Sequence, residues 1–307
     1  MLKVTVVGGG HVGASCALRL AEMEIASEVV IVDILEDMTK GKALDMWEAA
    51  PVYGFNTRLN GTSDYADTAN SHVVVITAGL ARKPGMSRDD LLAKNAAIVG
   101  GIAENVAKHS PDAFIINVTN PLDEMTNVIL QRSGFKSNKV MGMAGVLDSA
   151  RFSAFIAMEL NVAVEDVTAF VLGGHGDTMV PVVDYTSVSG IPLRKLMADD
   201  KIEAIVTRTR KAGGEIVALL KTGSAYYSPG AAAAKMAESI IKGKNNILPA
   251  SAFLTGEYGI DGTYIGVPIL LGKNGVEKVY EIDLDEESLN VLQSTAQKIK
   301  DATANIG

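Results

Sequence analysis

The stretch that decides the fold is KVTVVGGGHVG at Lys3–Gly13. It opens with a run of β-branched residues, which favours a buried strand, and it ends in glycines spaced as G-x-G-x-x-G at Gly8, Gly10 and Gly13. Apolar residues then recur at helical spacing over His11–Glu22. A strand, a glycine turn and a helix in this order predict the first unit of a doubly wound α/β domain.

The same alternation of strand and helix continues over the first half of the chain. Further apolar, strand-like runs occupy 28–33, 72–78, 113–119 and 139–143, and helical segments occupy 38–50, 87–109 and 121–132. Continuous apolar strands that alternate with helices are typical of a parallel sheet covered on both faces. We therefore predict an α/β fold whose first domain, residues 1–145, is a doubly wound parallel sheet of the Rossmann type.

The second half has a different pattern and predicts a mixed α+β domain over residues 146–307. Its β-rich stretches are 166–172, 179–188, 264–271 and 276–282, and its expected helices are 147–160, 200–221, 230–242 and a last one with Asp285 as N-cap. No internal repeat or long linker is visible. The two domains are therefore expected to pack tightly.

Composition excludes several classes of protein. The 307 residues include 28 basic and 36 acidic side chains, and a net charge of −8 disfavours a nucleic-acid partner. The single cysteine, Cys16, excludes an internal disulfide and fits a reducing compartment. Apolar runs such as 73–81 are too short to span a membrane, and a strand-like run directly follows residue 3. We expect a cytoplasmic protein with no membrane partner and no signal peptide.

The glycine turn has the features of a dinucleotide site. Gly8 permits a tight turn, Gly10 lets a pyrophosphate approach the backbone, and Gly13 allows close packing of helix and strand. Asp33, 20 residues after Gly13, can accept both hydroxyls of an adenosine ribose and would repel the extra phosphate of NADP. This favours NAD. The alternatives are a plain structural turn and a methyltransferase loop that holds an adenosyl cofactor.

Four other segments carry candidate chemistry. His175 lies between glycines in GGHGD at 173–177, and an imidazole exchanges protons near neutral pH, although a lone histidine is more often structural. Asn120 follows the fourth strand, where ligands bind in such sheets. Asp148 and Arg151 share one face of a first helical turn, a spacing that is usually a surface ion pair. Residues 79–88 carry two arginines, Arg82 and Arg88, in a segment with two glycines, as in a mobile lid or a solvated loop.

Taken together, these segments resemble the lactate/malate dehydrogenase family, and within it the lactate-dehydrogenase-like malate dehydrogenases of bacteria. The resemblance runs from Lys3 to the final helix. It is carried by the glycine turn, Asp33, ITAGLARKPGMSR at 76–88, VTNP at 118–121, MAGVLDSARF at 143–152 and LGGHGD at 172–177. These later motifs argue against a methyltransferase. No metal is implied, because the four histidines are scattered along the chain.

The resemblance implies a role for each candidate residue. His175 would take the hydroxyl proton of malate while hydride passes to NAD, and Asp148 would fix its tautomer. Arg151 would hold the carboxylate next to the reacting carbon, and Arg88 would polarise the substrate carbonyl. The implied catalytic set is His175, Asp148 and Arg88. The substrate-binding set is Arg82, Arg88, Asn120, Arg151 and Ser224. The cofactor-binding set is Gly8, Gly9, Gly10, His11, Val12, Gly13, Asp33, Asn95, Val118, Thr119 and Asn120.

Arg82 favours malate over lactate as the substrate. It stands where lactate enzymes of this family have an uncharged glutamine, and malate and oxaloacetate carry a second carboxylate where lactate and pyruvate carry a methyl group. An unpaired buried charge costs about 2–5 kcal/mol, or about 30-fold to several thousandfold in rate. The alternatives are an Arg82 that points to solvent, a lactate or other 2-hydroxy-acid dehydrogenase, and a non-catalytic NAD-sensing module.

The resemblance also bears on assembly and on one departure from the family pattern. His11 lies inside the glycine loop, where many relatives have a small amide. The simplest interpretation is a solvated side chain, and the alternative is a contact with the pyrophosphate. The helix at 38–50, with Trp47, packs against another subunit in relatives. We therefore expect a homodimer or homotetramer that acts in the tricarboxylic acid cycle.

Overall fold

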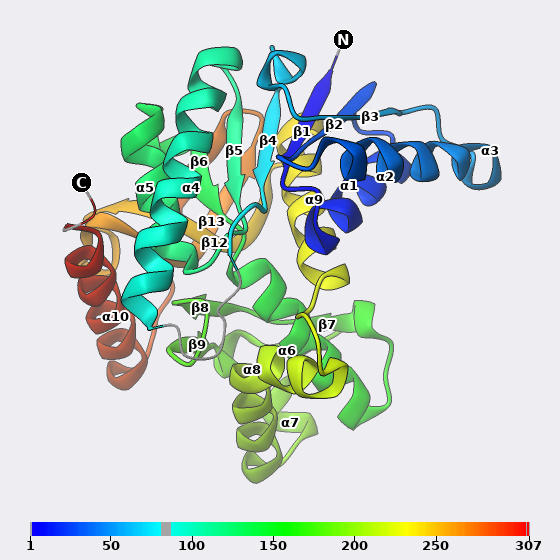
Figure 1. Ribbon diagram of the computed structural model, residues 1–307. Coiled ribbons are helices and arrows are strands. Elements are labelled where there is room, and N and C mark those ends of the chain that lie inside the picture. The colour runs from blue at the N-terminus through cyan, green and yellow to red at the C-terminus, as the bar shows by residue number, and fades with distance from the viewer. Residues whose placement is uncertain (1, 81–86, 305, 307) are drawn as a thin grey trace.

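The computed structural model of the chain describes residues 2–80, 87–304 and 306, without the side chain of Arg88. Arg82 and the rest of 81–86 lie outside the described residues. Figure 1 shows a layer of strands with helices on both sides and a lower lobe built from the first part of the second half.

The first half forms a parallel sheet in the order β3-β2-β1-β4-β5-β6. Its strands are β1 (Lys3–Val7), β2 (Glu28–Val32), β3 (Arg58–Thr62), β4 (Val73–Ile76), β5 (Phe114–Asn117) and β6 (Val140–Gly142). Its helices are α1 (His11–Glu22), α2 (Glu36–Glu48), α3 (Ala50–Tyr53), α4 (Arg88–His109) and α5 (Leu122–Ser133). The predicted doubly wound sheet is confirmed.

Alternate residues of the strands fill two separate apolar cores. Val4 and Val6 are fully buried in one cluster, with side chains of α1 and α9 (Tyr227–Lys242). Val7 and Ile76 belong to the other, with side chains of α4 and α5. A sheet buried on both faces needs apolar residues at every strand position, which is why these strands are continuous Val and Ile runs.

The sheet does not end at the predicted domain boundary. Strand β6 pairs with β12 (Asn246–Thr255), and the order continues through β13 (Asp261–Gly272), β8 (Val171–Gly173) and β9 (Met179–Pro181), with β14 (Gly275–Val279) paired to β13. The two halves thus share one 11-stranded sheet. The boundary near residue 145, which falls between β6 and the next helix, remains a proposal.

Sequence analysis predicted neither β3 nor β12. The β3 sequence RLNGT is partly exposed and includes a glycine, and the β12 sequence NILPASAFLT contains proline and alanines in place of a β-branched run. Two β-rich stretches, 166–172 and 179–188, are divided into shorter pieces. A small sheet there joins β7 (Val167–Thr168), β10 (Ser187–Val188) and β11 (Ile191–Pro192).

The remaining helices are α6 (Gly145–Leu160), α7 (Leu193–Leu196), α8 (Asp199–Leu220) and α10 (Glu286–Ala304). Asp285 accepts a 2.8 Å hydrogen bond from the Ser288 amide at the start of α10, so the predicted N-cap is confirmed. Among the described helices, none is both long and apolar enough to cross a membrane.

Candidate active site

Strand order places the predicted site residues at one edge of the sheet. The glycine turn follows β1, Asn120 follows β5, and α6 follows β6, all at the carboxyl ends of parallel strands. Strand order reverses between β1 and β4, and such a switch point opens a crevice where ligands bind. The turn that carries His175 leaves β8 beside β13 in the same sheet.

His175 and Asp148 form a close pair. Nδ1 of His175 lies 2.7 Å from Oδ2 of Asp148, and the two side chains are 15% and 2% exposed. Asp148 lies in the first turn of α6, whereas His175 follows β8, so tertiary structure brings them together. Burial lowers the pKa of the His175 imidazole, but the attraction of the Asp148 carboxylate outweighs it, and the net pKa is raised above its ordinary value.

Arg151 completes this cluster from the next turn of α6. Its Nη1 lies 3.4 Å from Oδ1 of Asp148, and its side chain is 13% exposed. Its Nε is buried and, within the part of the chain that the structure describes, makes no hydrogen bond. A buried donor without a partner is costly, and a carboxylate ligand would satisfy it.

The glycine turn has the geometry of a phosphate site. Gly8 has a φ of +103°, which favours glycine, and a Cβ on Gly13 would lie 1.8 Å from the Gly8 carbonyl oxygen. Helix α1 starts after Gly10 with neither a side-chain cap nor an acidic residue in its first turn. A Cβ at Gly10 would meet open space. The amide groups at this helix end are therefore available to an anion, which fits the diphosphate of a dinucleotide.

Two charged side chains hold Gly9 from both sides. Its N–H donates to Asp33 Oδ2 over 2.7 Å, and its carbonyl accepts from Lys42 Nζ over 2.6 Å. The other Asp33 oxygen accepts from the Leu35 amide at 3.1 Å. Sequence reasoning found Asp33 but missed Lys42, because a lysine on an exposed helix such as α2 gives no signal of its contact with the turn.

The second half of the glycine loop also lies close to the start of α9. The exposed His11 ring lies 5.0 Å from the Tyr226 ring, between centroids, and Val12 is half-buried beside it. Ser224 lies in the exposed connection between α8 and α9. Among the described residues, no hydrogen bond joins Ser224 to His175, Asp148 or Arg151.

Asn95 connects two turns at the carboxyl edge. Its fully buried amide accepts from the Leu80 N–H at 2.8 Å and donates to the carbonyls of Leu80 and Asn120 at 3.1 and 2.7 Å. Thr119 Oγ1 donates to the Ala78 carbonyl at 2.8 Å. Val118 is buried, whereas Asn120 is exposed and open to a ligand. Asn95 thus orders the turn that presents Asn120.

The two arginines of residues 79–88 are only partly described. Ser87 caps α4 by accepting from the Asp90 amide at 3.0 Å, while the Ser87 amide donates back to Asp90. This capping box fixes where the helix begins, at Arg88, whose side chain is not described. Arg82 lies outside the described residues.

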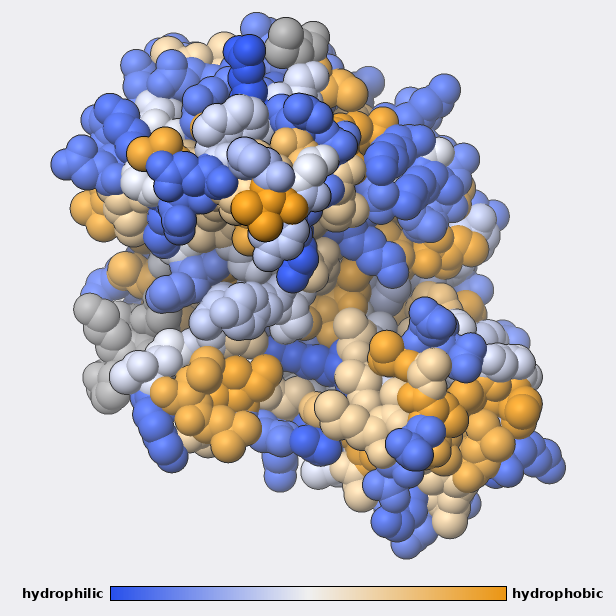
Figure 2. All heavy atoms as spheres, turned by 90° about the vertical axis from the view of Figure 1, so that its right-hand side faces the viewer, coloured by the Kyte–Doolittle hydropathy of each residue, from blue (hydrophilic) through white to orange (hydrophobic). Residues whose placement is uncertain are grey.

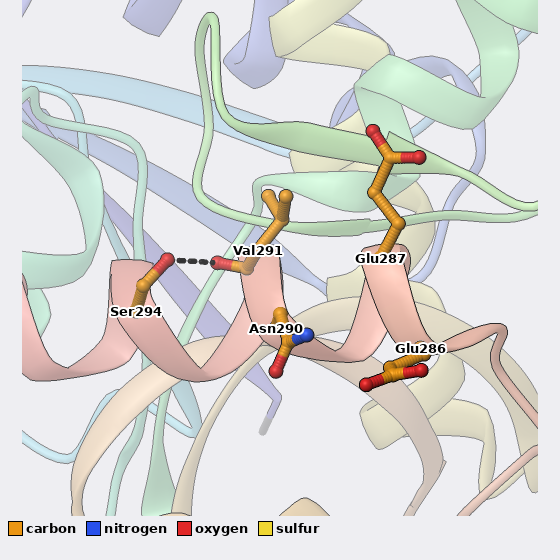
Figure 3. A pocket seen from close by; sticks show the side chains of 5 residues that line it. All are labelled: Glu286, Glu287, Asn290, Val291 and Ser294. Atoms are coloured by element: carbon orange, nitrogen blue, oxygen red, sulfur yellow. Dashed lines mark hydrogen bonds between the residues drawn. The ribbon is translucent and has the colours of Figure 1, made fainter.

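A hollow on the surface of α10 is a poor alternative site. It is lined by Glu286, Glu287, Asn290, Val291 and Ser294, and none of the predicted site residues is among them (Figure 3). Two carboxylates at its wall repel the anionic cofactor and substrate that the sequence implies. The site is therefore sought at the sheet edge and not here.

Comparison with known proteins gives the family. Residues 2–142 match the model for the lactate/malate dehydrogenase NAD binding domain, and residues 145–306 match that for the lactate/malate dehydrogenase alpha/beta C-terminal domain. The chain belongs to the lactate/malate dehydrogenase family. The resemblance inferred from the motifs is thus confirmed over almost the whole length.

Several relatives are similar over their full length. The chain is 56% identical to a malate dehydrogenase of Chlorobium phaeobacteroides over 305 residues, covering 99% of this chain and 98% of that protein. The structure of malate dehydrogenase from Salinibacter ruber is 54% identical, with a TM-score of 0.95 and coverage of 99% and 97%. Lactate dehydrogenase from Cryptosporidium parvum, solved with lactic acid and NAD, is 42% identical, with a TM-score of 0.94 and coverage of 99% and 98%. Together, these relatives support an NAD-dependent malate dehydrogenase.

Proposed function

We propose that this chain catalyses reversible hydride transfer between (S)-malate and NAD, giving oxaloacetate and NADH, with His175 as general acid and base. The observation that carries the proposal is the 2.7 Å contact of His175 with the buried Asp148, with Arg151 one turn further along α6. The similarity to proteins named malate dehydrogenase supports the choice of substrate.

The histidine is oriented for proton transfer. Because Nδ1–H donates to Asp148, the neutral ring has its acceptor at Nε2, which takes the malate hydroxyl proton. Asp148 then stabilises the imidazolium that forms, as the raised pKa of His175 indicates. A bound NAD would supply the hydride acceptor for the carbon that carries this hydroxyl.

Arginines orient the dicarboxylic acid in this proposal. The unpaired Nε of Arg151 is the donor for the carboxylate beside the reacting carbon. Arg88 at the start of α4 polarises the carbonyl of oxaloacetate, and Arg82 pairs with the far carboxylate. Asn120 and Ser224 contribute polar contacts from the sheet edge and from the connection before α9.

The cofactor takes its place along the glycine turn. The free amides of α1 and its positive end hold the diphosphate, near Gly9, Gly10, His11 and Val12. Asp33 accepts the adenosine ribose hydroxyls, which selects NAD over NADP. Val118, Thr119 and Asn120 line the nicotinamide end, and Asn95 acts there through the turn it orders.

We also propose a homo-oligomer that acts in the cytoplasm, in the tricarboxylic acid cycle. Four large apolar side chains of α2 and α3 are exposed in the single chain: Leu44, Trp47, Val52 and Tyr53. Figure 2 shows apolar side chains on this side of the molecule, and a further apolar area lower down, where Figure 1 places α6 to α8. Such surfaces mark interfaces more often than solvated faces. Light scattering on the protein as it elutes from a size-exclusion column measures the number of subunits.

A rate assay decides between this function and its nearest rival. The high similarity to a lactate dehydrogenase shows that the fold does not separate the two substrates. NADH oxidation is measured with oxaloacetate and, separately, with pyruvate. We expect kcat/KM for oxaloacetate to exceed that for pyruvate by about 100-fold or more. A preference for pyruvate would make the chain a lactate dehydrogenase, and no oxidation with either would contradict the assignment of an enzyme.

A further inference from the structure

Asp123 is a buried carboxyl group that none of the roles above uses. It lies in the first turn of α5 and is 3% exposed. Its Oδ1 accepts a hydrogen bond of 2.5 Å from Ser251 Oγ, on the neighbouring strand β12. A carboxyl group that is this deeply buried is rare unless it is paired or has a function.

The carboxylate of Asp123 faces the turn that carries His175. Oδ2 of this carboxyl group lies beside Gly174, the residue before His175 in the chain. A Cβ on Gly174 would lie 3.9 Å from Asp123 Oδ2, and nearer still to side chains of Thr178 and Thr295. Gly174 is therefore enclosed, and the turn passes close to Asp123 because residue 174 has no side chain.

We propose that Asp123 is a positioning residue for proton transfer at His175: its carboxylate lies against the main chain of the turn and places a second negative charge near the imidazole. The proposal rests on the assignment of His175 as the general acid and base. Asp148 contacts the ring nitrogen, and Asp123, from α5, lies against the residue before His175 in the chain.

The two groups are coupled electrostatically. Burial raises the pKa of Asp123 to about 7, against the opposing effects of the Ser251 hydrogen bond and of His175. The negative charge of Asp123 in turn helps to raise the pKa of His175. Other charged groups of the packed elements are Asp148, Arg151, Glu124 and, on α10 beside β8 (Figure 3), Glu286 and Glu287. Asp123 therefore favours the imidazolium, the form that donates a proton to oxaloacetate.

The test is the pH dependence of Asp123→Asn. Oxaloacetate reduction requires protonated His175, so its kcat/KM falls as pH rises through the histidine pKa. Loss of the Asp123 charge lowers that pKa, and we expect the falling limb to move down by about one pH unit. The rising limb of malate oxidation moves in the same direction. At a pH above the falling limbs of both the wild type and the variant, kcat/KM for oxaloacetate should be about tenfold lower in the variant.

Two further variants separate position from charge. Ser251→Ala removes a donor to Asp123 and leaves the carboxyl group, so a smaller shift in the same direction is expected. Asp112→Asn is the matched control, because this exposed carboxylate pairs with Lys139 at the opposite edge of the sheet. Its pH profile should equal that of the wild type. Thermal unfolding shows whether each variant is folded.

The outcomes are distinct. Folded variants of Asp123 and Ser251 that are slower but keep the wild-type pH profile would show that the pair is only structural, and the inference falls. If Asp123→Asn does not fold, the pH profile of Ser251→Ala decides: a downward shift of the falling limb supports the inference, and an unchanged profile contradicts it. A wild type without oxaloacetate activity overturns the proposed function itself, and this inference with it.

Discussion

Main-chain groups make the contacts at the glycine turn, whereas charged side chains make them around His175. At the turn, the Gly9 amide and carbonyl bind Asp33 and Lys42, and the free amides of α1 point outward. Around His175, the buried carboxylate of Asp148 lies 2.7 Å from the imidazole and 3.4 Å from the guanidinium of Arg151. A main-chain group is kept through most side-chain substitutions. Removing the partner of a buried charge, in contrast, is strongly destabilising.

The contrast predicts a difference in kinetics. Substitutions around His175 should lower kcat by orders of magnitude and leave cofactor affinity unchanged. Substitutions around the glycine turn should change the affinity for cofactor by smaller factors and leave kcat nearly intact.

The largest effect is expected for His175→Asn. Asparagine fills a similar volume but cannot exchange a proton, so turnover should fall by about two to four orders of magnitude. Steady-state rates measure the loss, and fluorescence titration should give an unchanged Kd for NADH. His109→Asn, at the end of α4, is the matched control. If NADH affinity fell by the same factor as the turnover rate, the proposed difference between the His175 region and the glycine turn would be wrong.

Arg82→Gln comes next and tests substrate choice. Glutamine leaves the far carboxylate of oxaloacetate unpaired, so kcat/KM for oxaloacetate should fall about 100-fold or more, while that for pyruvate rises. The neighbouring cation Lys83, changed to Gln, controls for the charge of the segment. Unchanged kcat/KM with both substrates would refute the assignment of Arg82.

Asp33→Ser should have an intermediate effect on the cofactor. Serine cannot accept both ribose hydroxyls, so KM for NAD should rise about tenfold or more. The repulsion of the NADP phosphate is removed as well, and KM for NADP should fall. Asp37→Ser, an exposed residue of α2, is the control. Preference for NAD that survives in Asp33→Ser would place the selectivity elsewhere.

The smallest effect is expected for Lys42→Met. Methionine keeps the length of the side chain but loses the hydrogen bond to the Gly9 carbonyl. NADH should bind about two- to tenfold more weakly, with kcat unchanged. Lys40→Met changes a lysine of the same helix that pairs with the exposed Glu36, and this variant should bind NADH normally. An equal loss in both variants would point to overall charge instead of the contact.

Parts of this site were predictable because their signals are local. The glycine spacing, the continuous Val and Ile strands and Asp285 as a cap all depend on residues adjacent in the chain. The roles of His175, Asp148 and Arg151 came from the family resemblance and not from spacing. Lys42 and Asp123 gave no signal, because their partners Gly9 and Ser251 lie far away in sequence. Strand β12 was missed because burial, and not β-propensity, makes it a strand.

The sequence by itself determined the doubly wound first half, the NAD-type glycine turn and the family, because repeated apolar patterns and short motifs act over a few residues. Only the tertiary structure decided that both halves share one sheet, that the His175 ring contacts Asp148 of α6 and that Asp123 of α5 lies beside the same turn. Electrostatic effects depend on distance and burial in space, and the chain acquires both only when strands distant in sequence pair.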